Sequence, residues 1–140
     1  MNIIIDSNIM IGALLKDSKI REIIVNSSDE MYLPEIALSE INEHKQELLN
    51  KSGLTEEDFD ELFKRLLKYV NLVPNIEIIK FKDEAYEIIG KIDKDDVAFI
   101  ATSIAFEYCP IWTDDYHFKK QNKIRIITTE EIINLYYSNV

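Results

Sequence analysis

The sequence predicts an α/β protein in which helices cover both faces of a central, mainly parallel sheet. Short β-branched runs alternate along the chain with longer amphipathic segments, a pattern typical of strand–helix–strand units. Glycine and proline occur only three times each, which favours long regular elements with few turns. The chain has 140 residues, 46% of them hydrophobic, which is enough to build one continuous core. We therefore expect a single domain spanning residues 1–140.

Five strands are expected where short apolar runs are bounded by acids, prolines or polar turns: residues 3–5, 31–33, 76–79, 110–113 and 124–127. The first run consists of three isoleucines and stops at Asp6, which suits a strand buried on both faces. Pro34 stops the second run, and Pro74 precedes the third.

Seven helices are expected: residues 10–15, 20–26, 34–50, 55–67, 83–89, 97–106 and 128–137. Asp17 or Ser18 is the expected N-cap of the second helix. Pro34 suits the first turn of the third, where a missing N–H costs nothing. Thr128 and Glu131 form a capping box that opens the last.

Two of these helices follow one another and predict a helical hairpin inserted into the alternating pattern. A break at residues 51–53 separates them, and Thr55 caps the second, with acids in its first turn. The second helix carries apolar residues at helical spacing: Phe59, Leu62, Phe63, Leu66 and Leu67.

Composition excludes several classes of protein. The net charge of −10, from 26 acidic and 16 basic residues, is unlike that of a strongly basic nucleic-acid binder. The single Cys109 excludes a disulfide scaffold and favours a reducing, cytoplasmic setting. We expect no targeting segment and no membrane association, because the most apolar run, at residues 97–106, is about half the length that spans a bilayer.

Acidic side chains follow the expected strands at the edge where an open parallel sheet binds ligands. Asp6 ends the first strand, and Asp114 and Asp115 come just after the fourth. Asp96 begins a buried helix, and Glu40 lies on the helix that follows the second strand. In a doubly wound sheet these carboxylates converge on one rim.

Carboxylates that converge repel one another, so either some take up protons or a divalent metal ion binds. Two unit charges about 4 Å apart repel by about 4 kcal/mol at an effective dielectric constant of roughly 20. A ligand set made only of oxygen atoms favours Mg²⁺ or Mn²⁺ over zinc. Such an ion activates water and orients a phosphodiester, so the pattern points to hydrolysis of a nucleic-acid backbone.

Four segments, in order along the chain, combine an apolar stretch with an acidic residue: residues 3–8, 34–40, 93–101 and 112–118. In the first, a hydrophobic strand runs into Asp6, Ser7 and Asn8. In the fourth, a strand ends in Thr113, which is followed by a polar residue and Asp115. Together these segments resemble those of the PIN domain family, and the resemblance covers residues 2–128, nearly the whole chain.

The resemblance implies a three-layer α/β/α sandwich and a Mg²⁺- or Mn²⁺-dependent ribonuclease, often the VapC-like toxin of a toxin–antitoxin pair. It carries four metal-binding, catalytic residues over to Asp6, Glu40, Asp96 and Asp115. It assigns supporting roles to Ser7, Asn8, Asp93, Thr113 and Asp114. It also implies an RNA substrate, products with 3′-hydroxyl and 5′-phosphate ends, a small antitoxin protein as partner, and a homodimer.

Two acid doublets leave the register open by one residue: Asp95-Asp96 and Asp114-Asp115. We prefer the second member of each, because it aligns with the residues that follow it in the family's segments. Glu35 and Glu43 lie close enough to Glu40 along the chain to compete with it.

Other chemistry-bearing residues have simpler interpretations. His44 and His117 are expected to be non-catalytic, although His117 is close enough to the proposed site to contact phosphate. Trp112 and Tyr116 either stack on a base or pack in the core and rim, and packing is the commoner role. A basic strip near the site would offset the acidic surface: Lys119, Lys120, Lys123 and Arg125.

Two other functions compete with the nuclease. A receiver-type phosphoacceptor domain also clusters Asp residues and Mg²⁺, but it needs an acceptor Asp directly after the third strand, and none follows residues 76–79. A PIN-like module that binds RNA or protein with weak or lost catalysis is the second alternative. The acidic surface favours that module, and the complete set of four acids favours the nuclease.

Overall fold

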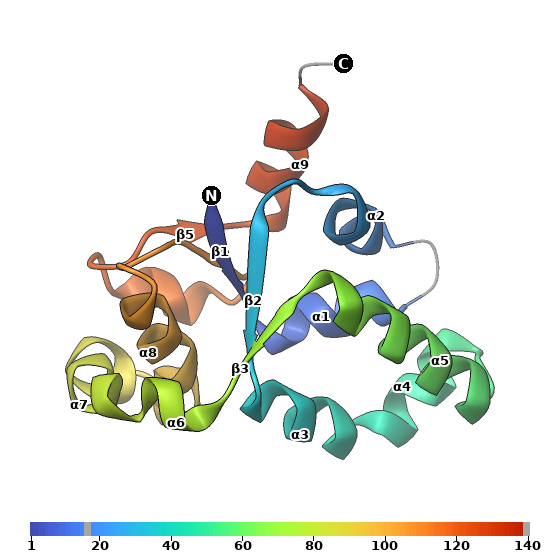
Figure 1. Ribbon diagram of the computed structural model, residues 1–140, viewed down its shortest axis with the longest axis horizontal. Helices are drawn as coiled ribbons and strands as arrows, with labels where there is room; N and C mark the ends of the chain where they lie inside the picture. The colour runs from blue at the N-terminus through green and yellow to red at the C-terminus, as the bar shows by residue number, and fades with distance from the viewer. Residues whose placement is uncertain (16–17, 139–140) are drawn as a thin grey trace.

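The computed structural model describes residues 1–15 and 18–138, which form a three-layer α/β/α sandwich (Figure 1). Five parallel strands lie in the order β3-β2-β1-β4-β5 in the described residues. Their bounds are β1 (Asn2–Ile5), β2 (Glu30–Pro34), β3 (Asn71–Val73), β4 (Ile111–Trp112) and β5 (Ile126–Ile127). The predicted fold class is confirmed.

The helices are α1 (Ser7–Leu14), α2 (Lys19–Asn26), α3 (Ile36–Glu43), α4 (Lys45–Ser52), α5 (Glu56–Leu66), α6 (Asn75–Ile78), α7 (Lys82–Ala85), α8 (Val97–Ala105) and α9 (Thr129–Tyr137). Short 3₁₀ turns are η1 (Leu67–Tyr69), η2 (Ile79–Phe81), η4 (Lys94–Asp96) and η5 (Tyr116–Lys120), and η3 (Tyr86–Gly90) is a π-helical turn. Helices α6 and α7 pack on α8, which contacts β1, β2 and β4. Helices α1, α2, α5 and α9 are linked by contacts on the other side of the sheet (Figure 1).

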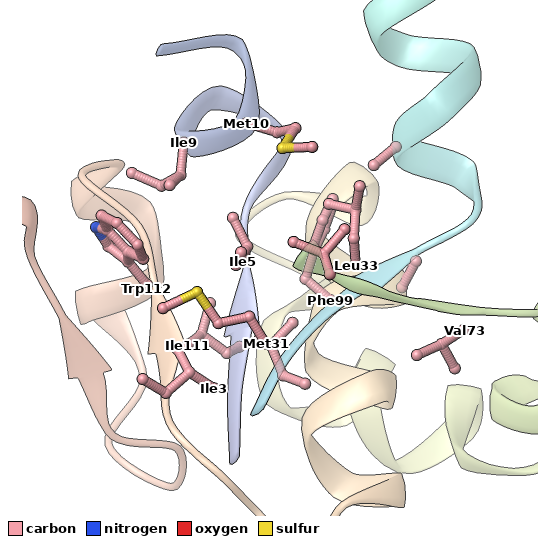
Figure 2. Packing of buried hydrophobic residues seen from close by; sticks show 14 of the residues in the cluster. Ile3, Ile5, Ile9, Met10, Met31, Leu33, Val73, Phe99, Ile111 and Trp112 are labelled. Carbon is pink, nitrogen blue, oxygen red and sulfur yellow. The ribbon is translucent and has the colours of Figure 1, made fainter. Parts of the chain in front are cut away.

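The core lies on both faces of the sheet, as the run of three isoleucines predicts. Ile4 pairs with Tyr32 of β2 and with Ile111 of β4, and Ile5 pairs with Trp112. Figure 2 shows that these strands present their side chains to residues of α1 and α8, such as Met10 and Phe99. Burying each such side chain contributes about 1.5 to 3 kcal/mol. The ends of β1 and β4 are therefore held on a rigid platform.

The expected helix caps are present wherever the structure describes them. The side chains of Ser18, Thr55 and Thr128 accept hydrogen bonds from backbone N–H groups in the first turns of α2, α5 and α9. Asp17, the other cap considered for α2, lies outside the described residues.

The third strand is not at residues 76–79, and that prediction is wrong. The strand is β3, which ends at Val73, and residues 75–78 form α6. Ile76 is 81% exposed and Ile79 is 57% exposed, whereas Ile78 is buried. A run with a single buried residue suits a helical turn on the surface, while Val73 pairs with Pro34 inside the sheet.

The helix expected at 34–50 is two helices, and Pro34 ends β2 instead of starting a helix. The backbone leaves helical geometry at His44 (φ −96°, ψ 7°), which separates α3 from α4. The hairpin with α5 is present: Lys45 Nζ lies 3.0 Å from Glu56 and 2.8 Å from Asp60.

The first helix begins earlier than predicted. It starts at Ser7 and not at Met10, so the chain turns from strand to helix directly at Asp6. In residues 1–15 and 18–138, no helix has both the length and the apolarity needed to cross a membrane.

Candidate active site at the carboxyl edge of the sheet

The candidate site lies where β1 and β4 end side by side in the middle of the sheet. The strand order reverses its direction along the chain between these two strands, and ligands of doubly wound sheets bind at this point. Asp6 directly follows β1, and Thr113 directly follows β4. The Asp6 N–H donates to the Trp112 carbonyl at 3.1 Å, which ties the two strand ends together.

Asp6 and Thr113 form a buried hydrogen-bonded pair. The Thr113 hydroxyl donates to Asp6 Oδ2 at 2.7 Å, and both residues are buried. The same hydroxyl oxygen accepts the Asp115 N–H at 3.0 Å. Thr113 therefore fixes the Asp6 carboxylate and the backbone of Asp115 relative to each other.

Burial raises the pKa of Asp6, and the charge of Asp115 raises it further. The hydrogen bond from Thr113 and the backbone N–H groups of Ser7 and Asn8 oppose this rise but do not cancel it. The negative form of Asp6 is therefore destabilised where it lies.

Asp96 is the most strongly perturbed carboxyl group of the site. It lies at the N-terminus of α8, where it is 8% exposed, and its Oδ2 atom is buried with no hydrogen-bond partner in the structure. Burial, and then the charges of Asp93, Asp115, Asp6 and Asp95, raise its pKa to about 7. Three carboxylates from three separate chain segments therefore act on one another: Asp6, Asp96 and Asp115.

Glu40 reaches the cluster from α3. Burial is the largest cause of its raised pKa, and the charges of Asp6, Asp95 and Glu43 raise the pKa further. The Ser7 hydroxyl lies close enough to lower the pKa of Glu40 in part, although it does not reach hydrogen-bond geometry. Glu43 is exposed, so of these two residues Glu40 lies deeper in the site.

Asp115 begins the turn η5. Its Oδ1 atom accepts the His117 N–H at 2.9 Å, and the His117 ring Nδ1 lies 3.0 Å from the same oxygen but outside hydrogen-bond direction. Asp115 is partly exposed, so one side of its carboxylate faces the rim.

The first members of the two acid doublets lie differently from the second. The Asp114 carboxylate accepts two hydrogen bonds from Thr129, one from its N–H at 2.7 Å and one from its hydroxyl at 2.5 Å. Asp114 is therefore bound to the first residue of α9 and is not part of the carboxylate cluster. Asp95 is exposed, and its N–H donates to Asp93 Oδ1 at 2.9 Å. Asn8 is also exposed.

A family model described as "PIN domain" matches residues 4–135. The chain belongs to the PIN domain family. The resemblance seen in its four acidic segments is thereby confirmed.

The PIN fold is also found in a solved structure. A chain in the crystal structure of VapBC2 from Rickettsia felis, bound to a DNA fragment from its promoter, superposes with a TM-score of 0.62 at 17% sequence identity. The match covers 91% of this chain and 98% of that one. No curated protein sequence matches this chain.

The residues of this PIN domain fit a hard divalent cation. In residues 1–15 and 18–138, no ion pair joins a lysine or arginine to Asp6, Asp96 or Glu40, so these three acids lack a basic side chain as counter-charge. Its donors are all oxygen atoms, and Asp96 Oδ2 has no partner. Across the described part of the chain, no group of three or more acid, imidazole or thiol side chains already has the arrangement of a metal-binding site. In the described residues the carboxylates therefore approach one another without forming a ready-made metal site.

Trp112 is fully buried, and its Nε1–H donates to Thr129 Oγ1 at 3.0 Å, so it is a core residue and does not stack on a base. Tyr116 is 65% exposed on the rim, and the centre of its ring lies 5.3 Å from Lys120 Nζ.

Sequence reasoning missed a groove of about 600 Å³ beside the carboxylates. It is lined in part by Lys82, Tyr86 and Lys94, together with Glu40 and Asp95. The lysines lie some 50 residues beyond Glu40 in the chain and carry no motif. One signal in the sequence could have indicated this groove: a basic residue at 82 and an aromatic residue at 86 lie one helical turn apart.

Proposed function

We propose that this PIN domain is a Mg²⁺- or Mn²⁺-dependent endoribonuclease and the toxin of a toxin–antitoxin pair. One observation carries the proposal: at the switch point of the sheet, burial and the charge of Asp115 raise the pKa values of Asp6 and Asp96, and no lysine or arginine of the described residues pairs with either acid. PIN domains are generally nucleases, and a site with this charge distribution is stabilised by a bound dication and its phosphodiester substrate.

Each residue has a defined role in this proposal. Asp6, Asp96 and Asp115 would hold the metal, and Thr113 keeps the Asp6 carboxylate in place through its 2.7 Å hydrogen bond. A metal ion bound here supplies an activated water and neutralises charge on the phosphate. Glu40 binds the ion or orients the attacking water, and its raised pKa suits its carboxylate oxygen to accept a proton.

The products follow from the family resemblance. In-line attack of water on phosphorus breaks the bond to the 3′ oxygen, so that the fragments carry 3′-hydroxyl and 5′-phosphate ends. The proton released by the water passes to Glu40, and the departing 3′ oxygen takes up one proton from solvent, so that one water is consumed for each bond broken.

The structural neighbour supports a protein partner. Its complex is named VapBC2 and is bound to promoter DNA. By analogy, we propose that a small antitoxin binds this chain and that the chain forms a homodimer. The shared fold at 17% identity supports this analogy but carries no residue-level contact.

The receiver-type alternative has little support. The strands lie in the order β3-β2-β1-β4-β5, whereas receiver domains follow the order 2-1-3-4-5. The residue after β3 is Pro74 and not an acceptor aspartate.

The test is cleavage of RNA by the purified protein. We expect cleavage with Mn²⁺ or Mg²⁺, none in EDTA, and none by Asp96→Asn under either condition. Glu61→Gln is the matched control, because Glu61 is an exposed acid on α5 that pairs with Arg65. Unchanged cleavage by Asp96→Asn with Mn²⁺ present would refute the proposal.

A second measurement separates the nuclease from the binding module. Calorimetric titration with Mn²⁺ reports metal binding independently of RNA. Metal binding without cleavage of any tested RNA would favour a module that has lost catalysis. Arrest of bacterial growth on expression, relieved by Asp96→Asn, would support the toxin assignment.

A further inference from the structure

The groove beside the carboxylates is lined by two parts of the chain. The α3 wall carries Glu40 and Glu43, and the wall formed by α7 to η4 carries Lys82 and Lys94. Asp95, which immediately precedes Asp96 in the chain, also lines the groove. Through Glu40, on which the charge of Asp6 acts, the groove borders the carboxylate cluster.

The two lysines of the groove are not engaged by acids of the protein. Across the described chain, neither Lys82 nor Lys94 has a carboxylate oxygen within 4.0 Å, whereas Lys45 and Lys51 each bind a glutamate at about 3 Å. In a chain of net charge −10, two uncommitted ammonium groups beside an active-site cluster suit the binding of phosphate groups.

Tyr86 is held on the same wall by an unusual piece of backbone. It begins the π-helical turn that ends at Gly90, and its side chain is 47% exposed. A Cβ atom at Gly90 would lie 2.1 Å from Tyr86 Cδ2 and 2.5 Å from Cγ. The ring therefore packs directly on the Gly90 backbone, in space that any side chain at 90 would fill. π-Helical turns are frequent at functional sites.

We propose that this groove binds a single-stranded stretch of RNA next to the cleaved bond, with one base stacked on Tyr86 and adjacent phosphates on Lys82 and Lys94. This inference rests on the proposed ribonuclease function and names the residues outside the carboxylate cluster that position its substrate. A base stacks on a protein aromatic ring only after it leaves the helical stack, so paired RNA is excluded from the groove. Gly90 acts as a positioning residue, because it leaves room for the Tyr86 ring.

The first test measures binding in EDTA, where no cleavage occurs, by fluorescence anisotropy of a short labelled single-stranded oligoribonucleotide. We expect Tyr86→Ala to weaken binding about tenfold, the effect of losing one base–aromatic stack, and Tyr86→Phe to retain it. The control is Tyr69→Ala, because Tyr69 is 49% exposed and lies outside the groove. A perfectly paired duplex of the same sequence should bind more weakly than the single strand.

The lysines are tested by salt dependence. Each of Lys82→Ala and Lys94→Ala should reduce the slope of log affinity against log salt by about 0.7, the value for one phosphate contact on a single strand. Lys68→Ala, at an exposed lysine outside the groove, should leave the slope unchanged.

A double-variant experiment tests whether Gly90 acts by setting the position of the Tyr86 ring. Gly90→Ala should weaken single-strand binding by about as much as Tyr86→Ala, and the double variant should bind no more weakly than either single variant. Circular dichroism of each variant establishes that the fold is retained. Additive losses would show that Gly90 does not act through Tyr86.

The outcomes separate this inference from the nuclease proposal. Wild-type binding by Tyr86→Ala, or equal binding of the duplex, overturns the inference even where metal-dependent cleavage is intact, and would leave the groove to a protein partner. Loss of binding in the Tyr86 and lysine variants supports the inference even where no RNA is cleaved.

Discussion

The two ends of the sheet hold aspartates in opposite electrostatic conditions. At the amino ends of β1 and β2, Asp29 accepts hydrogen bonds from the Met1 ammonium at 3.0 Å and the Tyr136 hydroxyl at 2.5 Å. Burial alone would raise the pKa of Asp29, but these donors lower it overall. At the carboxyl ends of β1 and β4, Asp6 and Asp96 have raised pKa values.

The contrast distinguishes a structural acid from a candidate catalytic one. Both clusters gather polar groups from distant parts of the chain, so proximity alone does not mark a site. The cluster around Asp29 is neutralised by groups of the protein itself, and nothing further is required to stabilise it. The cluster around Asp96 is destabilised until a cation or proton arrives.

The largest expected effect is the loss of RNA cleavage caused by the substitution Asp6→Asn. The amide keeps an acceptor for Thr113 but removes the charge that would hold a metal. We expect cleavage of RNA to fall about a thousandfold or more, equivalent to about 4 kcal/mol, with no loss of folding stability. Cleavage assays with Mn²⁺ and thermal unfolding measure the two effects, and cleavage within about tenfold of wild type would contradict the assignment.

The second effect is a pH dependence of stability in metal-free protein. Because the pKa of Asp96 rises to about 7 in the folded state, the fold holds this proton more tightly than the unfolded chain does. The stabilisation is complete below the ordinary pKa of 3.8 and is lost as pH rises towards 7. At roughly 1.4 kcal/mol for each unit of pKa the full shift corresponds to about 4 kcal/mol. Because solvent screens part of the interaction, we expect the free energy of unfolding to fall by about 3 kcal/mol over this window.

Asp96→Asn is the control for the pH effect, because an amide does not titrate. The fall between pH 4 and 7 should be much smaller in this variant, as judged from urea unfolding followed by circular dichroism. Excess Mn²⁺ should stabilise the wild type more at pH 8 than at pH 5, since it binds the ionised carboxylates. Equal pH profiles for wild type and variant would show that Asp96 is not perturbed as proposed.

The third effect tests the other end of the sheet. Asp29→Asn removes the charge that binds the Met1 ammonium and the Tyr136 hydroxyl. We expect a loss of about 1 to 2 kcal/mol in the free energy of unfolding, because the cluster is partly exposed, with RNA cleavage at the wild-type rate. A parallel loss of cleavage in folded protein would remove the distinction between the two ends.

The smallest effect separates the members of one acid doublet. Asp114→Ala removes the acceptor of the Thr129 N–H and hydroxyl at the start of α9. We expect destabilisation of about 0.5 to 1 kcal/mol in thermal unfolding. Asp115→Ala should instead abolish cleavage, and the reverse pattern would move the metal ligand back to Asp114.

Much of the fold was predictable because its local signals agree with its tertiary structure. The three isoleucines before Asp6 are buried to 0% exposure in the central strand, as their β-branched run indicates. The caps at Thr55 and Thr128 follow directly from residue chemistry.

The misassigned third strand shows the limit of such signals. Residues 76–79 contain three isoleucines and look more like a strand than Asn71-Leu72-Val73. Only the pairing of Leu72 and Val73 with β2 identifies β3, and that pairing is a long-range contact. The spacing of apolar residues and the composition of a segment do not reveal such a long-range pairing.

The candidate site was predictable in its residue types but not in its geometry. The sequence leaves open which member of each doublet faces the site, because that depends on the direction in which the chain leaves the strand. Asp114 turns to Thr129 only because α9 begins beside β4. The groove wall with Tyr86 depends on a π-helical turn, which has no sequence signature comparable with a cap.

The chain's single tryptophan has a practical consequence for spectroscopy. Trp112 is fully buried, precedes Thr113 in the chain, and donates its indole N–H to Thr129, which in turn donates to Asp114. Its emission therefore arises from one chromophore in one buried environment, next in the chain to the threonine that binds Asp6. The protein carries an intrinsic optical reporter for ion titrations, and no dye or label has to be attached near the rim.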